Sequence, residues 1–320
     1  MENGENLYLE LFRVSRAELE GLMAKALSSG ADFADIYFEC TNYTNLLLKD
    51  SQVTSGGYHE DFGAGIRVLC GERTGYSCCE TTERRDMEAA VDAASAICAA
   101  GGYTRNVCAG HAPSGSKYGN AHEKAAAGIK PRDGLYGMKD SWESCSRRKM
   151  AELLKRIDEE LRRRDPRVVK VIAQISDSVS WVMMFNSLGE LTFETRPMGS
   201  VSVSAVFSGH GLDGKPTNIT KSESRSFRMG AEMLSDSLVN ELADGVLRNL
   251  DARFEAVRPK GGKMPVVMGA GASGILLHEA MGHAFEADFN RKGQSIFSDR
   301  MGQRICARGI SIVDDGTIPG

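Results

Sequence analysis

The sequence predicts an α+β fold with an N-terminal α/β domain, a central mixed domain, and the start of a β-rich C-terminal domain that carries a candidate metal-binding helix. Helix-like and strand-like apolar patterns alternate over residues 1–100 and again over 147–255. A polar stretch with little periodicity, 101–146, lies between them and is interpreted as a linker or irregular loop. A histidine-bearing helix follows a glycine run within 256–320. The chain of 320 residues is long enough for two or three domains.

The N-terminal domain opens with a helix whose start is marked by Ser15 and Glu18, a capping-box pair. Apolar residues then recur at helical spacing until Gly30, which is a typical helix end. Strand-rich composition and turn residues define the rest of this domain. Its remaining predicted elements are strands over 34–40 and 42–48, a hairpin of 65–70 with 74–78, and a helix over 86–100.

The eight cysteines show no CxxC pair, and only Cys78 and Cys79 are adjacent. We therefore expect free thiols in a reducing compartment. Cys306 is the exception, because it follows the histidine motif closely enough to reach a metal. His111 and His122 lie in the polar stretch and are expected to be solvated loop residues.

The central domain begins with an amphipathic helix over 150–161, followed by basic residues that suit a helix C-terminus and by Pro166. The segment 200–207 alternates apolar and small polar residues, as a half-buried antiparallel strand does. The other predicted elements are strands over 168–175, 180–185 and 190–195, a turn at 186–189, and a long helix over 226–250.

The C-terminal part opens with residues 263–268, which have the composition of a buried strand. The glycines that follow, Gly269 to Gly274, match the GxGxxG pattern of dinucleotide-binding proteins. A nicotinamide site would also need a second parallel strand that ends in an acid about twenty residues later, and no such strand is evident. The glycines are better explained by a tight strand-to-helix turn.

The helix after these glycines carries His278, Glu279 and His283, which form an HExxxH motif. Neutral imidazoles are good zinc ligands, and a neighbouring carboxylate can accept a proton from the attacking water. Residues five apart differ by about 140° around an ideal helix, so both rings reach one ion only if the helix is widened or bent. Gly282 permits such a distortion. The alternative is that these are ordinary histidines of an amphipathic helix.

The segment 277–288 closely resembles the signature of the TldD/PmbA family, in particular its TldD-type metalloprotease branch. The segments 31–39 and 63–68 resemble the N-terminal domain of that family, and 311–320 resembles the stretch after its active-site helix. The resemblance implies that His278 and His283 bind zinc and that Glu279 is the catalytic glutamate. It also implies a peptide or unfolded protein substrate and a homo- or hetero-oligomer of TldD/PmbA type, in which a related subunit lacks the motif.

A catalytic zinc usually has three protein ligands, and the motif supplies two. The resemblance implies that the third ligand is a cysteine in a C-terminal segment that this chain lacks, so we expect a C-terminally truncated sequence. Two alternatives remain: a substitute ligand within the chain, or a ligand from a partner subunit. The substitute candidates are Cys306, Glu286, Asp314 and Asp315.

The bulk composition is that of a soluble globular protein, with 42% hydrophobic residues, 26% charged residues and a formal net charge of −4. This mild acidity gives no reason to expect binding to nucleic acid, and no apolar run is long enough to cross a membrane. The polar N-terminus lacks the features of a secretory signal, so we expect a cytoplasmic protein. Together, the sequence predicts a zinc-dependent metallopeptidase; the alternative is a catalytically silent truncated subunit that binds a partner or peptide.

Overall fold

The computed structural model of the chain describes residues 2–99, 136, 138–271 and 273–315. The chain divides into two compact units, unit 1 (Met1–Ala256) and unit 2 (Val257–Ile318), and each is described by itself. The expected α+β class is confirmed, because unit 1 combines an antiparallel sheet with helices. Among the described residues, no helix has both the length and the apolar character needed to cross a bilayer.

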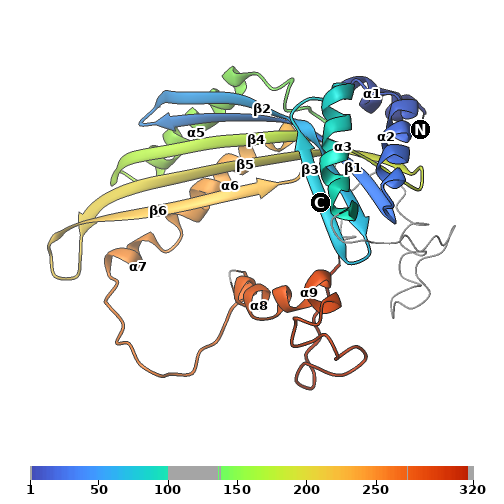
Figure 1. Ribbon diagram of the computed structural model, residues 1–320. Coiled ribbons are helices and arrows are strands. Elements are labelled where there is room, and N and C mark those ends of the chain that lie inside the picture. The colour runs from blue at the N-terminus through green and yellow to red at the C-terminus, as the bar shows by residue number, and fades with distance from the viewer. Residues whose placement is uncertain (1, 100–135, 137, 272, 316–320) are drawn as a thin grey trace. The chain divides into compact units, whose positions relative to one another are not determined.

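Unit 1 is built on a six-stranded sheet with the order β3-β2-β1-β4-β5-β6, in which all neighbouring strands are antiparallel (Figure 1). The two central strands, β1 and β4, are neighbours in the sheet but distant in sequence. The strands are β1 (Phe33–Lys49), β2 (Gln52–Cys70), β3 (Arg73–Cys79), β4 (Val168–Asn186), β5 (Leu191–His210) and β6 (Pro216–Phe227). The helices are α1 (Glu2–Leu11), α2 (Arg16–Ser28), α3 (Arg84–Ala99), α5 (Arg147–Arg164), η1 (Ala231–Met233), α6 (Asp236–Leu247) and α7 (Leu250–Phe254).

The helices bury one face of this sheet in two separate cores. On β1, Ile36 and Phe38 belong to the core under α1–α3, whereas Leu46 and Leu48 belong to the core under α5 and α6. All four positions are even-numbered, so both cores lie on the same face of the strand. The sheet itself continues without a break through the predicted N-terminal and central domains. The predicted domain boundaries remain a prediction.

On β5, the opposite face of the sheet is polar. Ser202 and Ser204 on β5 lie on this face, while Val201 and Val203 between and beside them are buried. Serine hydroxyls also meet across strands, where Ser222 on β6 donates a hydrogen bond of 3.0 Å to Ser204. The predicted alternation over 200–207 is therefore confirmed, and it defines which face carries the helices.

Local helix signals are confirmed in both parts of unit 1. The capping box forms at the start of α2, where Ser15 and Glu18 exchange side-chain and backbone hydrogen bonds. Ser146 caps α5 by accepting a hydrogen bond from the backbone N–H of Lys149 at 3.2 Å. The apolar stripe of α5 is buried, as its spacing predicted; its members are Met150, Leu153, Leu154, Ile157 and Leu161.

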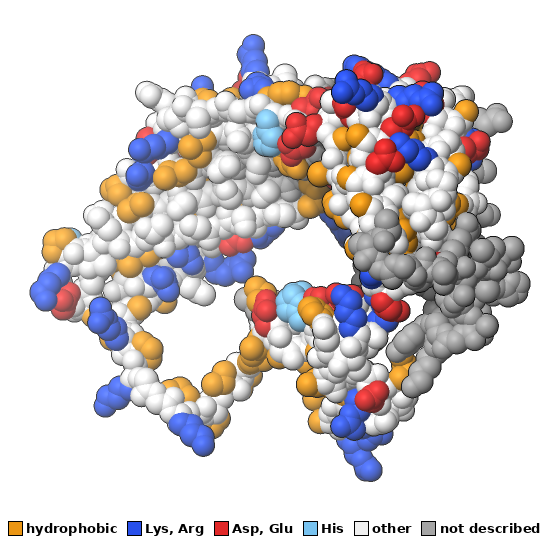
Figure 2. Space-filling model, in the orientation of Figure 1, with side chains coloured by type: hydrophobic (Ala, Val, Ile, Leu, Met, Phe, Trp, Pro, Cys, Tyr) orange, Lys and Arg blue, Asp and Glu red, His pale blue; other side chains and the backbone are white. Residues whose placement is uncertain are grey.

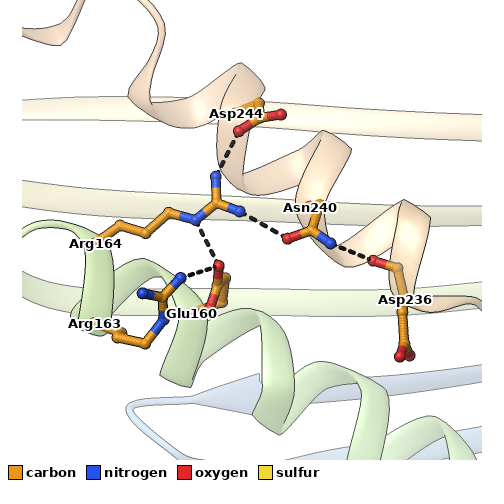
Figure 3. A network of polar contacts seen from close by, with 6 residues as sticks. All are labelled: Glu160, Arg163, Arg164, Asp236, Asn240 and Asp244. Atoms are coloured by element: carbon orange, nitrogen blue, oxygen red, sulfur yellow. Dashed lines mark hydrogen bonds and ion pairs between the residues drawn. The ribbon is translucent and has the colours of Figure 1, made fainter.

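A network of polar contacts joins the exposed sides of α5 and α6 (Figure 3). Arg164 donates to Glu160 on its own helix at 2.6 Å, to Asn240 on α6 at 2.7 Å, and to Asp244 on α6 at 2.5 Å. Hydrogen bonds from Arg163 and Arg164 hold the pKa of Glu160 at about 2. The basic end of α5 thus pairs with carboxylates of both helices.

The turn between β1 and β2 has an unusual backbone. Asp50 (φ 47°) and Ser51 (φ 67°) both lie in the left-handed region, which glycine and asparagine normally occupy in such hairpins. Contacts from outside the hairpin hold them: Ser51 donates to the buried carboxylate of Asp158 on α5, and the backbone N–H of Val171 donates to Asp50 at 3.0 Å. Arg162 donates to Asp158 at 2.9 Å and completes this contact.

One buried carboxyl group in the sheet has an oxygen atom without a hydrogen-bond partner. Asp177 on β4 is 8% exposed, and its Oδ2 atom accepts no hydrogen bond. It lies between Thr44 on β1 and Gly199 on β5 in the register of the sheet. Burial raises its pKa to about 7, although the charge of Arg147 opposes the shift.

The strands are longer and fewer than the sequence predicted. The two strands expected over 34–40 and 42–48 form the single strand β1, and the four expected over 168–207 form β4 and β5. Pro197 interrupts the pattern of β5 but not the strand, because it pairs with Val179 on β4 and lies before the first residue of β5 that pairs with β6. The hairpin turn at 186–189 is confirmed, with Gly189 at a φ of 82°.

The predicted helix over 226–250 is wrong in its first part. Residues 216–227 form the edge strand β6, and the helix α6 begins only at Asp236, after the cap at Ser235. Few side chains of β6 are apolar, so the strand lacks the usual sequence signal. On the side that faces the helices, Ile219 and Phe227 pack against the core, and Lys221 donates to the carbonyl of Arg248 at 2.9 Å. Charged edge strands are common because they resist unwanted pairing.

The expectation that all cysteines are free is also wrong. Cys70 at the end of β2 and Cys98 near the end of α3 form a disulfide, with a Cα–Cα distance of 5.7 Å. The fold brings together two residues that are 28 positions apart, and no spacing rule revealed this. His111 and His122 lie outside the described residues. At the end of the predicted linker, Trp142 is buried and donates to the carbonyl of Met229 at 2.8 Å, so this residue packs with unit 1.

Candidate metal centre

Unit 2 contains three short helical elements, α8 (Ser273–Met281), η2 (Gly282–Phe285) and α9 (Ala287–Arg291). The strand predicted over 263–268 is wrong: these residues have no regular structure, and Val267 is 98% exposed. A strand needs a neighbour to accept and donate its backbone hydrogen bonds, and the described residues of unit 2 offer none. The β-rich start expected here is not found among them.

The glycine run forms a turn that starts α8. Gly271 has a φ of 114°, which only glycine adopts readily, and its carbonyl accepts a hydrogen bond of 2.8 Å from the N–H of Gly274. No strand precedes or follows the helix within the described residues of unit 2. The dinucleotide-binding arrangement that the GxGxxG pattern could indicate is therefore not formed there.

The helix breaks between the two histidines. Helix α8 ends at Met281, whose φ of −133° is outside the helical range, and residues Gly282–Phe285 continue as a 3-10 turn. The expected distortion is thus a break followed by a tighter turn and not a widened helix. Gly282 leaves room for the first ring, because a Cβ at this position would lie 3.3 Å from Nδ1 of His278.

This break brings the three residues of the motif together. The ring centroids of His278 and His283 are 4.6 Å apart at an interplanar angle of 68°. Oε2 of Glu279 lies 3.5 Å from Nε2 of His283. One potential ligand atom from each of the three residues lies within 4.8 Å of those of the other two, and all three residues are exposed. The cluster has the donor types that zinc prefers, two imidazoles and a carboxylate, and solvent can reach it.

A further carboxylate contacts the second histidine. Oε1 of Glu286 lies 2.6 Å from Nδ1 of His283. This hydrogen bond raises the pKa of His283; desolvation acts against the shift, and the charges of Glu279 and Glu286 add to it. From the sequence, Glu286 was predicted only as a possible third ligand; its contact with His283 was not predicted, although the spacing of three residues allows it.

The other predicted ligands are not part of the cluster. Among the described residues, the structure groups only His278, Glu279 and His283, and it does not add Cys306, Asp314 or Asp315 to them. Cys306 is half-buried elsewhere in unit 2. A substitute third ligand from these residues is therefore not supported.

Comparison with protein families gives matches in three parts of the chain. Residues 34–98 match the domain described as PmbA/TldA metallopeptidase domain 1, residues 141–250 match the central domain, and residues 261–320 match the C-terminal domain. The last match includes the whole cluster.

Curated relatives carry the same family name. A protein of Haemophilus influenzae named metalloprotease TldD homolog is 31% identical over 297 residues, which cover 90% of this chain and 56% of that protein. A protein of the same name from Buchnera aphidicola (subsp. Acyrthosiphon pisum) is 27% identical over 289 residues, with the same coverage of 90% and 56%. The chain thus spans a little over half the length of these relatives.

Solved structures share the fold at low sequence identity. TldE from Thermococcus kodakarensis is 14% identical, with a TM-score of 0.57, and the match covers 88% of this chain and 58% of that one. A Bacteroides thetaiotaomicron protein described as a proposed modulator of DNA gyrase is 16% identical, with a TM-score of 0.60 and coverage of 90% and 61%. At these identities the likeness concerns the fold.

Proposed function

Because the chain belongs to the PmbA/TldD metallopeptidase family, we propose that it contributes the metal site of a zinc-dependent peptidase that hydrolyses peptides or unfolded proteins. The observation that carries the proposal is the convergence of His278, Glu279 and His283, whose potential ligand atoms lie within 4.8 Å of one another. A helix with residues at this spacing does not bring them together unless it is broken.

The three side chains have distinct roles in this proposal. His278 and His283 each offer a ring nitrogen as a zinc ligand. Glu279 is an exposed carboxylate beside both rings, so it can accept a proton from the attacking water and pass it to the leaving amine. When bound, zinc supplies a Lewis acid for the scissile carbonyl and for the water. A catalytic zinc usually has three protein ligands, so the proposal requires one more donor besides His278 and His283.

The substrate and the partner follow from the family. We propose an extended peptide or an unfolded protein as substrate, because relatives are named metalloproteases. We also propose assembly with other subunits of TldD/PmbA type. A cytoplasmic location remains a prediction.

Zinc stoichiometry separates this proposal from the alternative, a catalytically silent subunit that binds a partner or peptide. The purified chain is loaded with zinc, freed of excess metal by gel filtration and analysed by mass spectrometry. We expect one zinc per chain in the wild type, a loss of most of it in His278→Ala, and no change in His210→Ala, an exposed histidine at the end of β5. A zinc content of the wild type that does not exceed background would favour the catalytically silent subunit.

A second variant tests the role of the carboxylate. Glu279→Gln keeps the size of the side chain and removes its ability to accept a proton, so we expect zinc binding to persist. Hydrolysis of a fluorogenic unfolded peptide, measured with any partner subunit required for activity, should fall by at least about 100-fold. Hydrolysis at the wild-type rate would remove Glu279 from the mechanism.

A further inference from the structure

Glu286 contacts the ring nitrogen of His283 that does not face Glu279. Its Oε1 atom is 2.6 Å from Nδ1 of the ring, while Nε2 of the same ring faces Glu279 at 3.5 Å. The two nitrogens of His283 therefore have different neighbours. One faces a carboxylate in hydrogen-bond contact, and the other faces the cluster.

A carboxylate can only accept a hydrogen bond, so the proton of the neutral imidazole belongs on Nδ1 in this contact. The lone pair is then on Nε2, the nitrogen directed to the cluster. Without the contact, the ring would divide its time between the two tautomers and would rotate more freely about its side-chain torsions. The contact with Glu286 therefore leaves the unprotonated nitrogen on the side of the ring that faces Glu279.

The downstream segment holds Glu286 in place. Asn290 donates from its side chain to the carbonyl of Ala284 at 2.8 Å and to that of Glu286 at 3.0 Å. The hydroxyl of Ser295 donates to the carbonyl of Ala284 at 2.6 Å. The carbonyl groups at the end of the 3-10 turn are therefore occupied, and the turn that carries both His283 and Glu286 is fixed by the residues after it.

An aromatic pair closes the same turn. The rings of Phe285 and Phe297 are stacked, with centroids 4.9 Å apart and an interplanar angle of 8°. Phe285 directly precedes Glu286 in the chain, so the stack limits how far this backbone can move. None of the described side chains of unit 2 is buried, so these local contacts define where the carboxylate lies.

From these contacts we infer that Glu286 is a positioning residue, which fixes the tautomer and the orientation of His283 so that Nε2 is available to a zinc ion. The inference rests on the proposed function and adds a residue to it. It replaces the earlier expectation that Glu286 could be a ligand, since its carboxylate is already engaged with the ring.

Zinc affinity provides the first test. Wild type, Glu286→Ala and Glu286→Gln are titrated against a chromogenic zinc chelator at one fixed pH. We expect Glu286→Ala to weaken zinc binding by about 10- to 100-fold, as loss of such a carboxylate does in other zinc sites. Glu286→Gln retains an oxygen that can accept from Nδ1, so we expect it to remain within about fivefold of the wild type.

A matched control separates positioning from simple charge. Asp288→Asn removes one negative charge two residues further on, from an exposed side chain outside the cluster. We expect zinc affinity to stay within about twofold of the wild type. Equal losses in Asp288→Asn and Glu286→Ala would show a general effect of charge and would overturn the inference.

The tautomer of His283 provides a readout that does not need metal. Nitrogen-15 NMR of the metal-free protein, recorded above the titration range of the ring, should show the Nδ1–H tautomer in the wild type and a mixture in Glu286→Ala. An unchanged tautomer together with unchanged zinc affinity would refute the positioning role and leave the proposed function intact. Absence of zinc binding in the wild type would instead count against the proposed function.

Discussion

Large side chains such as Phe38 and Leu154 are completely buried in unit 1, whereas none of the described side chains of unit 2 is buried. Unit 1 owes its shape to apolar packing on one face of a long sheet. Unit 2 holds its candidate metal centre with hydrogen bonds between close neighbours in sequence, such as that between His283 and Glu286. The comparison teaches that the stability of the chain and the geometry of its site depend on different residues, which substitutions can separate.

The largest expected effect comes from the core of unit 1. Leu154→Ala removes a side chain that is 0% exposed, so we expect the free energy of unfolding to fall by about 2–5 kcal/mol through lost burial and a residual cavity. Val267→Ala in unit 2 removes a side chain that is 98% exposed, so the free energy of unfolding should change by less than about 0.5 kcal/mol. Urea unfolding followed by circular dichroism measures both; similar losses would contradict the comparison.

A smaller effect is expected where α5 holds the turn between β1 and β2. Asp158→Ala leaves Ser51 and Arg162 without a buried acceptor, and we expect a loss of about 1–3 kcal/mol in urea unfolding. The matched control on the same helix is Arg148→Ala, which removes an exposed ion pair with Glu152. That change should leave the free energy of unfolding nearly unchanged, because an exposed ion pair contributes little. Equal losses of unfolding free energy in the two variants would mean that burial does not strengthen the contacts of Asp158.

A pH-dependent effect is expected from Asp177, whose pKa is raised to about 7 in the folded state. Below about pH 4 the carboxyl group is protonated in both states. Between about pH 4 and 7 the unfolded chain releases this proton while the folded chain retains it, so stability from this group is lost as the pH rises through that window.

Asp177→Asn should therefore stabilise unit 1 at pH 8, on the order of 1–3 kcal/mol, and should change little at pH 4. Urea unfolding of both proteins at the two pH values measures the difference. A wild type and a variant with parallel pH profiles would show that the buried carboxyl group does not titrate as expected.

The smallest effect on stability is expected at the site itself. Gly282→Ala places a Cβ 3.3 Å from Nδ1 of His278 and crowds the ring. We expect the free energy of unfolding of unit 1 to change by less than about 0.5 kcal/mol, because Gly282 lies in unit 2. Zinc affinity, measured by chelator competition, should nevertheless fall by more than about threefold. A large loss of stability together with normal zinc affinity would contradict the conclusion that stability and site geometry depend on different residues.

The difference between the units also explains what the sequence could reveal. Signals that lie within one element were predicted correctly, such as the cap at Ser15 and the buried stripe of α5. Features that depend on distant partners were missed, because no local pattern encodes them. They include the continuity of β4, the polar edge strand β6 and the disulfide between Cys70 and Cys98.

The candidate site was partly predictable for the same reason. The motif places His278, Glu279 and His283 within two helical turns, so their proximity required only a local distortion at Gly282. The role of Glu286 depends on the exact path of the chain after the break, which Asn290 and Ser295 fix. Sequence spacing alone could not distinguish a ligand from a hydrogen-bond partner of a ligand.

The turn at Asp50 and Ser51 also ties the first hairpin to parts of the chain that are distant in sequence. Its two left-handed residues are held by Asp158 and Val171, which the ribosome adds more than a hundred positions later. Left-handed backbone is disfavoured at residues other than glycine, and these contacts offset that cost in the folded chain. The conformation of the β1–β2 turn therefore depends on α5 and β4, so a substitution in either of them can alter a hairpin that is distant in sequence.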